Sequence, residues 1–130
     1  ADETRAGLKI VHATYWVLAA ERFEEIRESA PGGMGHAGEM ETSVMLALHP
    51  ELVRTDLLEP DGEEQRCRFD HKDMLEPGRV GQFRLWNEWS EKGAIGDPTV
   101  ASAEKGELFI EAAVDAIAEL IVELKAGRIG

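Results

Sequence analysis

The stretch from residue 35 to 43 (Gly-His-Ala-Gly-Glu-Met-Glu-Thr-Ser) is denser in chemically useful side chains than any other part of the sequence. His36 lies in a glycine-flanked turn, and Glu39 and Glu41 follow it within five residues. Histidine is the side chain that most readily transfers protons near neutral pH, and a nearby carboxylate can orient its ring. One interpretation is therefore a catalytic turn in which His36 transfers a proton.

The same stretch also fits the start of a helix. Apolar residues fill positions 44–48 and Pro50 follows, so the pattern predicts a helix from about residue 38 to residue 49. This helix is apolar on most sides and is expected to be buried. Acidic side chains in its first turn would complement the positive end of the helix dipole. The pattern alone supports a helix start and a catalytic turn equally.

Residues 8–17 form the best candidate for a strand, because they are rich in β-branched and aromatic side chains and contain few polar ones. Trp16 lies at or just beyond the carboxyl end of this segment. In open α/β sheets that end faces the ligand crevice. Trp16 is therefore a candidate wall of a substrate site, and the alternative is a core tryptophan at a strand–loop junction.

Two further helices are expected on either side of a long irregular segment. Residues 19–29 predict a short amphipathic helix, broken by the Pro-Gly-Gly sequence at 31–33. The last helix runs to about Lys125, and either Asp97 or Ser102 can cap its start. It carries a solvated acidic stripe and a wide apolar face that is expected to be buried.

Residues 54–97 show no clear period and contain several proline and glycine residues. A connection of this length inside a compact domain is usually functional, so a loop or lid is expected. Residues 82–86 could form a short edge strand within it. Trp86 and Trp89 are interpreted as packing this loop down, although a ligand-binding role is the alternative.

Composition limits the classes of function. The 130 residues suit one domain, and the net charge of −12 argues against nucleic acid and anionic membrane, which both favour a basic surface. The single cysteine, Cys67, excludes a disulfide within the chain and is consistent with a reducing compartment. The sequence shows no bilayer-spanning apolar run and no signal-peptide pattern, so a cytoplasmic location is expected.

The predicted elements do not complete a sheet. A buried parallel strand needs neighbours on both sides, and residues 8–17 are the only convincing central strand in the sequence. The sequence therefore predicts the last portion of an α/β domain. Its first portion would come from another chain or from a segment outside these residues.

Residues 35–53 (GHAGEMETSVMLALHPELV) and, later, 96–107 resemble the C-terminal half of the creatininase (creatinine amidohydrolase) family. Tyr15-Trp16 falls where that family has a tryptophan after a strand, so the resemblance covers essentially residues 1–130. It implies a three-layer α/β/α domain with a mainly parallel sheet. That domain would be incomplete without its N-terminal half or a companion chain.

The resemblance also implies a metal-dependent hydrolase of amide-type C–N bonds that forms a homo-oligomer. His36 would be the proton-transfer group and Trp16 would help enclose a small polar amide substrate. Glu41 would lie in the same pocket, and we infer that it supports His36. Glu39 is then interpreted as a helix-start residue.

The metal ligands of the family belong to two motifs in its N-terminal half, a Glu-x-His with a following aspartate and an Asn-Gly-His region. Neither motif occurs in this sequence, so no residue of this chain is assigned as a ligand. Zinc, manganese or iron would be bound mainly by residues outside this chain. Two alternatives remain, a non-catalytic structural or regulatory subunit on the same fold and a relative that cleaves peptides or formamides.

Overall fold

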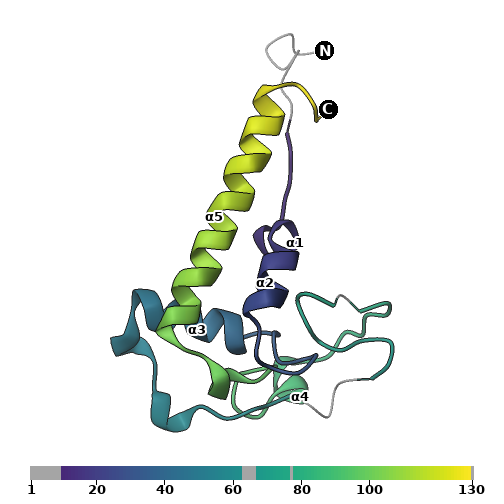
Figure 1. Ribbon diagram of the computed structural model, residues 1–130. Helices are drawn as coiled ribbons and strands as arrows, with labels where there is room; N and C mark the ends of the chain where they lie inside the picture. Colours follow the sequence, from purple (N-terminus) through teal and green to yellow (C-terminus); the bar gives the residue numbers. More distant parts are fainter. Residues whose placement is uncertain (1–9, 63–66, 77, 130) are drawn as a thin grey trace, which may run out of the picture.

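The computed structural model describes residues 10–62, 67–76 and 78–129, and Figure 1 shows how their elements are arranged. None of the helices in these ranges is both long and apolar enough to cross a membrane. In chain order the elements are α1 (Tyr15–Leu18), α2 (Ala20–Ile26), α3 (Glu39–Leu48), the 3₁₀ turns η2 (Pro50–Leu52) and η3 (Thr55–Leu57), α4 (Trp86–Trp89), η5 (Pro98–Val100) and α5 (Ala103–Lys125).

The long helix α5 is the axis of the molecule, with α3 lying across its N-terminal end and α1 and α2 beside it (Figure 1). The irregular segments and α4 gather at the α3 end of α5. Gly106 permits the close crossing of α3 and α5, because a Cβ at this position would overlap the carbonyl oxygen of Ser43. The start of α3, which follows His36 in the chain, is therefore held directly against α5.

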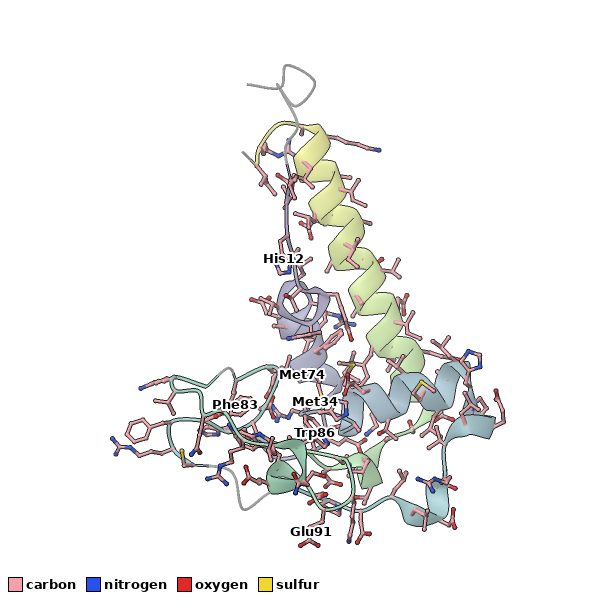
Figure 2. The ribbon with its side chains drawn as sticks, turned by 180° about the vertical axis from the view of Figure 1, so that it is seen from behind. His12, Met34, Met74, Phe83, Trp86 and Glu91 are labelled. Carbon is pink, nitrogen blue, oxygen red and sulfur yellow. The ribbon has the colours of Figure 1, made fainter. Side chains whose placement is uncertain are left out.

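The core is small and lies where these helices meet. Phe23 of α2 and Phe109 of α5 are fully or almost fully buried, and their rings pack edge to face with centroids 4.9 Å apart. Met34 and Met40 complete the buried centre. Met74 packs against this core from the long irregular segment, and Figure 2 shows it close to Met34. The core thus joins the helices to the segments around His36.

The predicted helices are confirmed with shifted ends. The helix expected over residues 19–29 is α2, which ends earlier, and the one expected from about 38 to 49 is α3. Ser102 caps α5, since its side chain accepts a hydrogen bond from the Lys105 N–H. Asp97 instead accepts from the Thr99 N–H and starts the separate turn η5.

The predicted strand over residues 8–17 is wrong for its described part. Residues 10–14 belong to no strand, and α1 begins at Tyr15, while residues 8 and 9 lie outside the described ranges. The described ranges contain no strand beside this segment, and its backbone therefore has no ladder of hydrogen bonds to join. Ile10 is 85% exposed as a result.

The mainly parallel sheet is likewise not seen in the described ranges. They contain two isolated antiparallel bridges, one between Asp61 and Gly96 and one between Cys67 and Asp70. The short edge strand predicted over residues 82–86 is also wrong. Residues 82–85 are irregular and residue 86 begins α4, whose first turn is closed by a bond from the Leu85 N–H to the Glu88 carboxylate.

The predicted burial of the apolar faces is wrong for α3 and for most of α5. The buried face of α3 consists of Glu39, Met40, Thr42 and Ser43, whereas Leu48 is exposed. On α5 the side chains with more than two-fifths exposure include Val114, Ile121 and Val122. Within the described ranges, no neighbouring element covers these apolar side chains.

The described parts of residues 54–97 are joined to each other near their two ends, and the C-terminal end is attached to the region of the His36 turn. The backbones of Asp61 and Gly96 exchange two hydrogen bonds, and the Asp97 N–H donates to the Gly33 oxygen at 3.0 Å. In the middle of the segment, the Met74 N–H donates to the Met34 oxygen at 3.0 Å. Whether this segment acts as a lid stays a prediction.

Candidate active site

The His36 turn is fixed by its backbone contacts. Gly35 has no room for a side chain, because a Cβ there would overlap the carbonyl oxygen of Ile95. The Ile95 N–H donates to the His36 carbonyl oxygen at 2.7 Å. Ala37 has a positive φ of 49°, a conformation that costs an L-residue about 1–2 kcal/mol. The surrounding contacts must therefore impose this turn.

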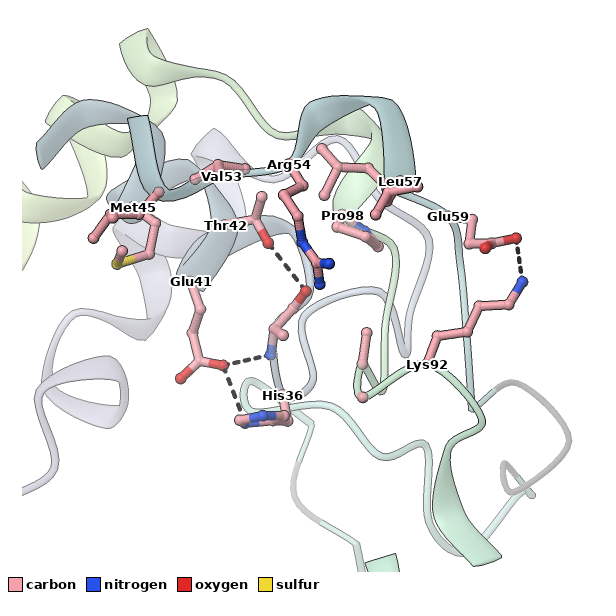
Figure 3. A pocket seen from close by; sticks show the side chains of 15 residues that line it. His36, Glu41, Thr42, Met45, Val53, Arg54, Leu57, Glu59, Lys92 and Pro98 are labelled. Carbon is pink, nitrogen blue, oxygen red and sulfur yellow. Dashed lines mark hydrogen bonds and ion pairs between the residues drawn. The ribbon is translucent and has the colours of Figure 1, made fainter. Parts of the chain in front are cut away.

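The imidazole of His36 lies beside the carboxylate of Glu41, as Figure 3 shows. His36 Nδ1 and Glu41 Oε2 are 3.6 Å apart, and the same oxygen accepts a hydrogen bond of 2.6 Å from the Ala37 N–H. Thr42 adds a bond from its hydroxyl to the Ala37 oxygen at 3.0 Å. Glu41 is thus held by the turn, in reach of the ring that the sequence predicts it to support.

Tyr15 shares the environment of this carboxylate. Burial of the phenol, and secondarily the negative charge of Glu41, raise the pKa of Tyr15 above its ordinary value. The phenol therefore stays protonated at neutral pH. It contributes a neutral hydroxyl to this part of the molecule rather than a charge.

His36 and Glu41 line an open pocket of about 490 Å³. Its apolar wall includes Met45, Leu57 and Pro98. Its charged side chains, besides those two, are Arg54, Glu59 and Lys92, of which the last two form an ion pair with each other. A pocket with an apolar wall and a few charged groups is typical of sites for small molecules or short peptides.

Trp86 is the aromatic neighbour of His36. The two ring centroids are 4.9 Å apart with the ring planes at 90°. Trp89 is engaged differently, since the Lys72 ammonium lies 4.0 Å from its ring centroid. The interpretation of both tryptophans as loop packing therefore suits Trp89, whereas Trp86 brings the long segment onto the site.

Trp16 lies elsewhere in the structure. Its ring packs edge to face on Tyr15, with centroids 5.0 Å apart, and the side chain is half-buried against the core. It is not among the residues that line the pocket beside His36. A role for Trp16 in enclosing substrate stays a prediction, as do the catalytic roles of His36 and Glu41.

Glu39 is a buried anchor beneath the site. Its fully buried carboxylate accepts hydrogen bonds from Lys105 Nζ at 2.7 Å and from the N–H groups of Ser29 at 2.8 Å and Glu28 at 2.9 Å. Burial opposes ionisation, but Lys105 and the backbone donors outweigh it and hold the pKa of Glu39 below its ordinary value. Glu39 is thus more than a helix-start residue, because it ties α3 to α5 and to the end of α2.

Asp73 is a second buried carboxylate and fixes the chain just before His36. It pairs with Arg27, and it accepts hydrogen bonds from the Gly32 N–H at 2.6 Å and the Leu75 N–H at 2.9 Å. No role is predicted from the sequence for Asp73 or Lys105. Each contacts residues more than forty positions away, and no local pattern indicates such a partner.

The described ranges contain no group of three or more histidine, cysteine, aspartate or glutamate side chains arranged to hold a metal ion. His36 and Glu41 supply two adjacent donors, whereas a catalytic zinc site uses three protein ligands. The residues described here therefore do not form a complete metal site.

The family model for creatinine amidohydrolase matches residues 1–121. The chain belongs to the creatininase family. This confirms the resemblance seen in residues 35–53 and 96–107, and it places the His36 turn within a family of known fold.

Individual relatives agree with this assignment. The chain is 38% identical over 89 residues to the mycofactocin precursor peptide peptidase of Mycobacterium tuberculosis, covering 67% of this chain and 32% of the relative. It is 31% identical over 122 residues to the creatinine amidohydrolase of Pseudomonas putida, covering 88% and 42%. The chain thus spans less than half the length of each of these relatives.

The fold is similar to that of a solved creatininase. The structure of a creatininase mutant of the Zn-Zn type matches with a TM-score of 0.63 and 28% sequence identity, covering 94% of this chain and 46% of that one. This similarity is consistent with the predicted α/β domain, although the described ranges form few β-contacts.

Proposed function

We propose that this creatininase-family chain carries the proton-transfer part of a hydrolase of amide-type C–N bonds. The observation that carries the proposal is the His36–Glu41 pair, held by the Ala37 N–H at the edge of a pocket. Its support from the comparisons is that the family is named for creatinine amidohydrolase and that another relative is a peptide peptidase.

In the proposed mechanism Glu41 orients the imidazole and balances its charge. The oxygen of a water molecule adds to the carbonyl carbon, and His36 takes up a proton from that water. His36 then donates the proton to the leaving nitrogen as the C–N bond breaks, so that the amine departs neutral. His36 lines the pocket together with Glu41, and Figure 3 shows the two side chains next to each other. A zinc, manganese or iron ion, bound mainly by residues outside this chain, would lower the pKa of a water molecule and polarise the carbonyl group.

We also propose that this chain is active only together with the N-terminal half of the family domain or with a companion chain. We call that assembly the completed protein. Two observations support it. The chain spans less than half of its relatives, and apolar side chains such as Ile10, Val114 and Val122 are exposed. A face of this kind becomes an interaction site where its apolar side chains adjoin one another. We further propose that the completed protein is a cytoplasmic homo-oligomer.

The test is the His36→Ala variant of the completed protein. General acid–base catalysis contributes about 10²–10⁴-fold, so kcat is expected to fall at least about a hundredfold with little loss of bound metal. His49→Ala is the matched control, because His49 has a similar carboxylate neighbour, Glu51 at 3.3 Å, and does not line the pocket. An unchanged kcat in His36→Ala would refute the assignment.

Peptides are the second candidate substrate class, favoured by the 38% identity to a peptide peptidase. The completed protein can be assayed with a cyclic amide, a set of short peptides and formamide. Cleavage of peptides alone would favour the peptidase alternative. A folded, metal-loaded protein that hydrolyses none of them would instead indicate a non-catalytic subunit.

A further inference from the structure

Arg54 borders the same pocket as His36 and Glu41 but takes no part in the mechanism proposed above. It lies between η2 and η3, in the N-cap position of η3. Figure 3 shows its guanidinium directed into the pocket, between the His36 turn and Pro98.

Of the two basic side chains that line this pocket, Arg54 is the one for which the described ranges show no carboxylate partner. Lys92 is paired with Glu59, and Glu41 is engaged by the Ala37 N–H and by His36. Within the described ranges, no carboxylate is placed in an ion pair with Arg54. The chain has 26 acidic and 14 basic residues, so a basic side chain that has no acidic partner within the described ranges stands out.

The surroundings of Arg54 define what it would bind. A guanidinium presents two parallel N–H donors that match the two oxygens of a carboxylate. Met45, Leu57 and Pro98 give the pocket an apolar wall. We propose that Arg54 binds a carboxylate on the substrate, so that the preferred substrates are amides with an apolar group and a free carboxylate. The reaction named here rests on the proposed function, whereas binding of the carboxylate does not.

Hydrolysis provides the first test. The completed protein would be assayed with leucyl-leucine, which has a free carboxylate, and with leucyl-leucinamide, in which that group is neutral. A charge-assisted hydrogen bond predicts a preference of about ten- to a hundredfold in kcat/KM for the carboxylate. Arg54→Gln should remove the preference, and Arg54→Lys should keep part of it. Arg79→Gln, which changes an exposed arginine outside the pocket, should leave it intact.

Binding provides a test that does not need turnover. Titration calorimetry would compare 4-methylpentanoate with 4-methylpentanamide on the completed protein and on its Arg54→Gln variant. Tighter binding of the carboxylate that disappears in the variant supports the inference, even if no amide is cleaved and the proposed function fails. Equal binding of the two probes, or a preference that survives in Arg54→Gln, overturns it even if amides are cleaved.

Discussion

Replacing Lys105 with methionine tests whether the buried ion pair with Glu39 holds the site together. The Glu39 side chain has 0% exposure and that of Lys105 has 11%, so neither charge has ready access to water. Lys105 lies in the first turn of α5, where a cation faces the unfavourable positive end of the helix dipole. The ion pair with Glu39 offsets this unfavourable placement of Lys105. Methionine keeps the length of the lysine side chain and the apolar contacts of its methylene groups.

The expected loss in the free energy of unfolding depends on which groups lose a partner when Lys105 is replaced. Removing one partner of a buried ion pair costs about 3–5 kcal/mol, because the other charge is left uncompensated. Glu39 keeps its two backbone donors, Ser29 and Glu28, which favours the lower end of that range. Removing a cation from a helix N-terminus returns about 0.3–1 kcal/mol. The free energy of unfolding at pH 7 should therefore fall by about 2–4 kcal/mol.

Urea denaturation of the completed protein, followed by circular dichroism, measures this change. Lys92→Met is the matched control, because its ion pair with Glu59 is half exposed and should contribute little. If Lys105→Met costs no more than Lys92→Met, the reasoning about burial is refuted. A double variant with Glu39→Gln should be less destabilised than the sum of the two single variants.

The same pair predicts a pH dependence. The pKa of Glu39 lies below its ordinary value of 4.5 in the folded protein. Its stabilising contribution is therefore complete above that ordinary value and is lost as the pH falls through the lowered folded pKa. In Lys105→Met the pKa of Glu39 should rise. The difference in unfolding free energy between wild type and variant should then be largest at pH 7 and should narrow below about pH 4.5.

Two further predictions concern the contacts around the His36 turn. Trp86→Ala should lower kcat by about three- to tenfold, which corresponds to the free energy of one aromatic contact. Trp86→Phe should keep most of the wild-type kcat. A change in KM without a change in kcat would show that Trp86 does not position His36. Gly106→Ala should destabilise the completed protein by about 1–3 kcal/mol in urea denaturation, despite the better helix propensity of alanine, because the new Cβ overlaps the Ser43 oxygen. Gly81→Ala, which has open space around it, is the control and should be nearly neutral.

The helices α2, α3 and α5 were predictable because their signals are local, whereas α1 and α4 were not predicted. Pro50 marks the end of α3, and Ser102 with the apolar period after it defines α5. The strand over residues 8–17 was not, because a strand forms only with neighbours, and local composition does not show whether they are present. Family resemblance therefore carried the prediction of an α/β domain further than the residue pattern did.

Only those parts of the candidate site that are close in the sequence could be predicted. His36 and Glu41 are five residues apart and do lie together. Which acid of the first turn is buried could not be read from the pattern. Glu39 and Glu41 are two residues apart and so point about 200° apart around α3, but the direction of the core is set by α5. The contacts of His36 with Trp86 and of Glu39 with Lys105 join distant segments and have no local signal.

The bonds that close residues 54–97 near their two ends have a consequence for how such a protein can diverge. The Asp61–Gly96 bonds join the two ends of this segment to each other, and the Asp97–Gly33 bond holds its C-terminal end against the chain just before His36. Phe83, within the segment, is 91% exposed, and a Cβ added at Gly81 would meet no described atom within 4 Å beyond its chain neighbours. Closing a loop twice as long costs only about 0.6 kcal/mol more. Insertions near residues 81–83 could thus reshape what approaches the pocket while the turn itself stays unchanged, so that new substrates become accessible without rebuilding the chemistry.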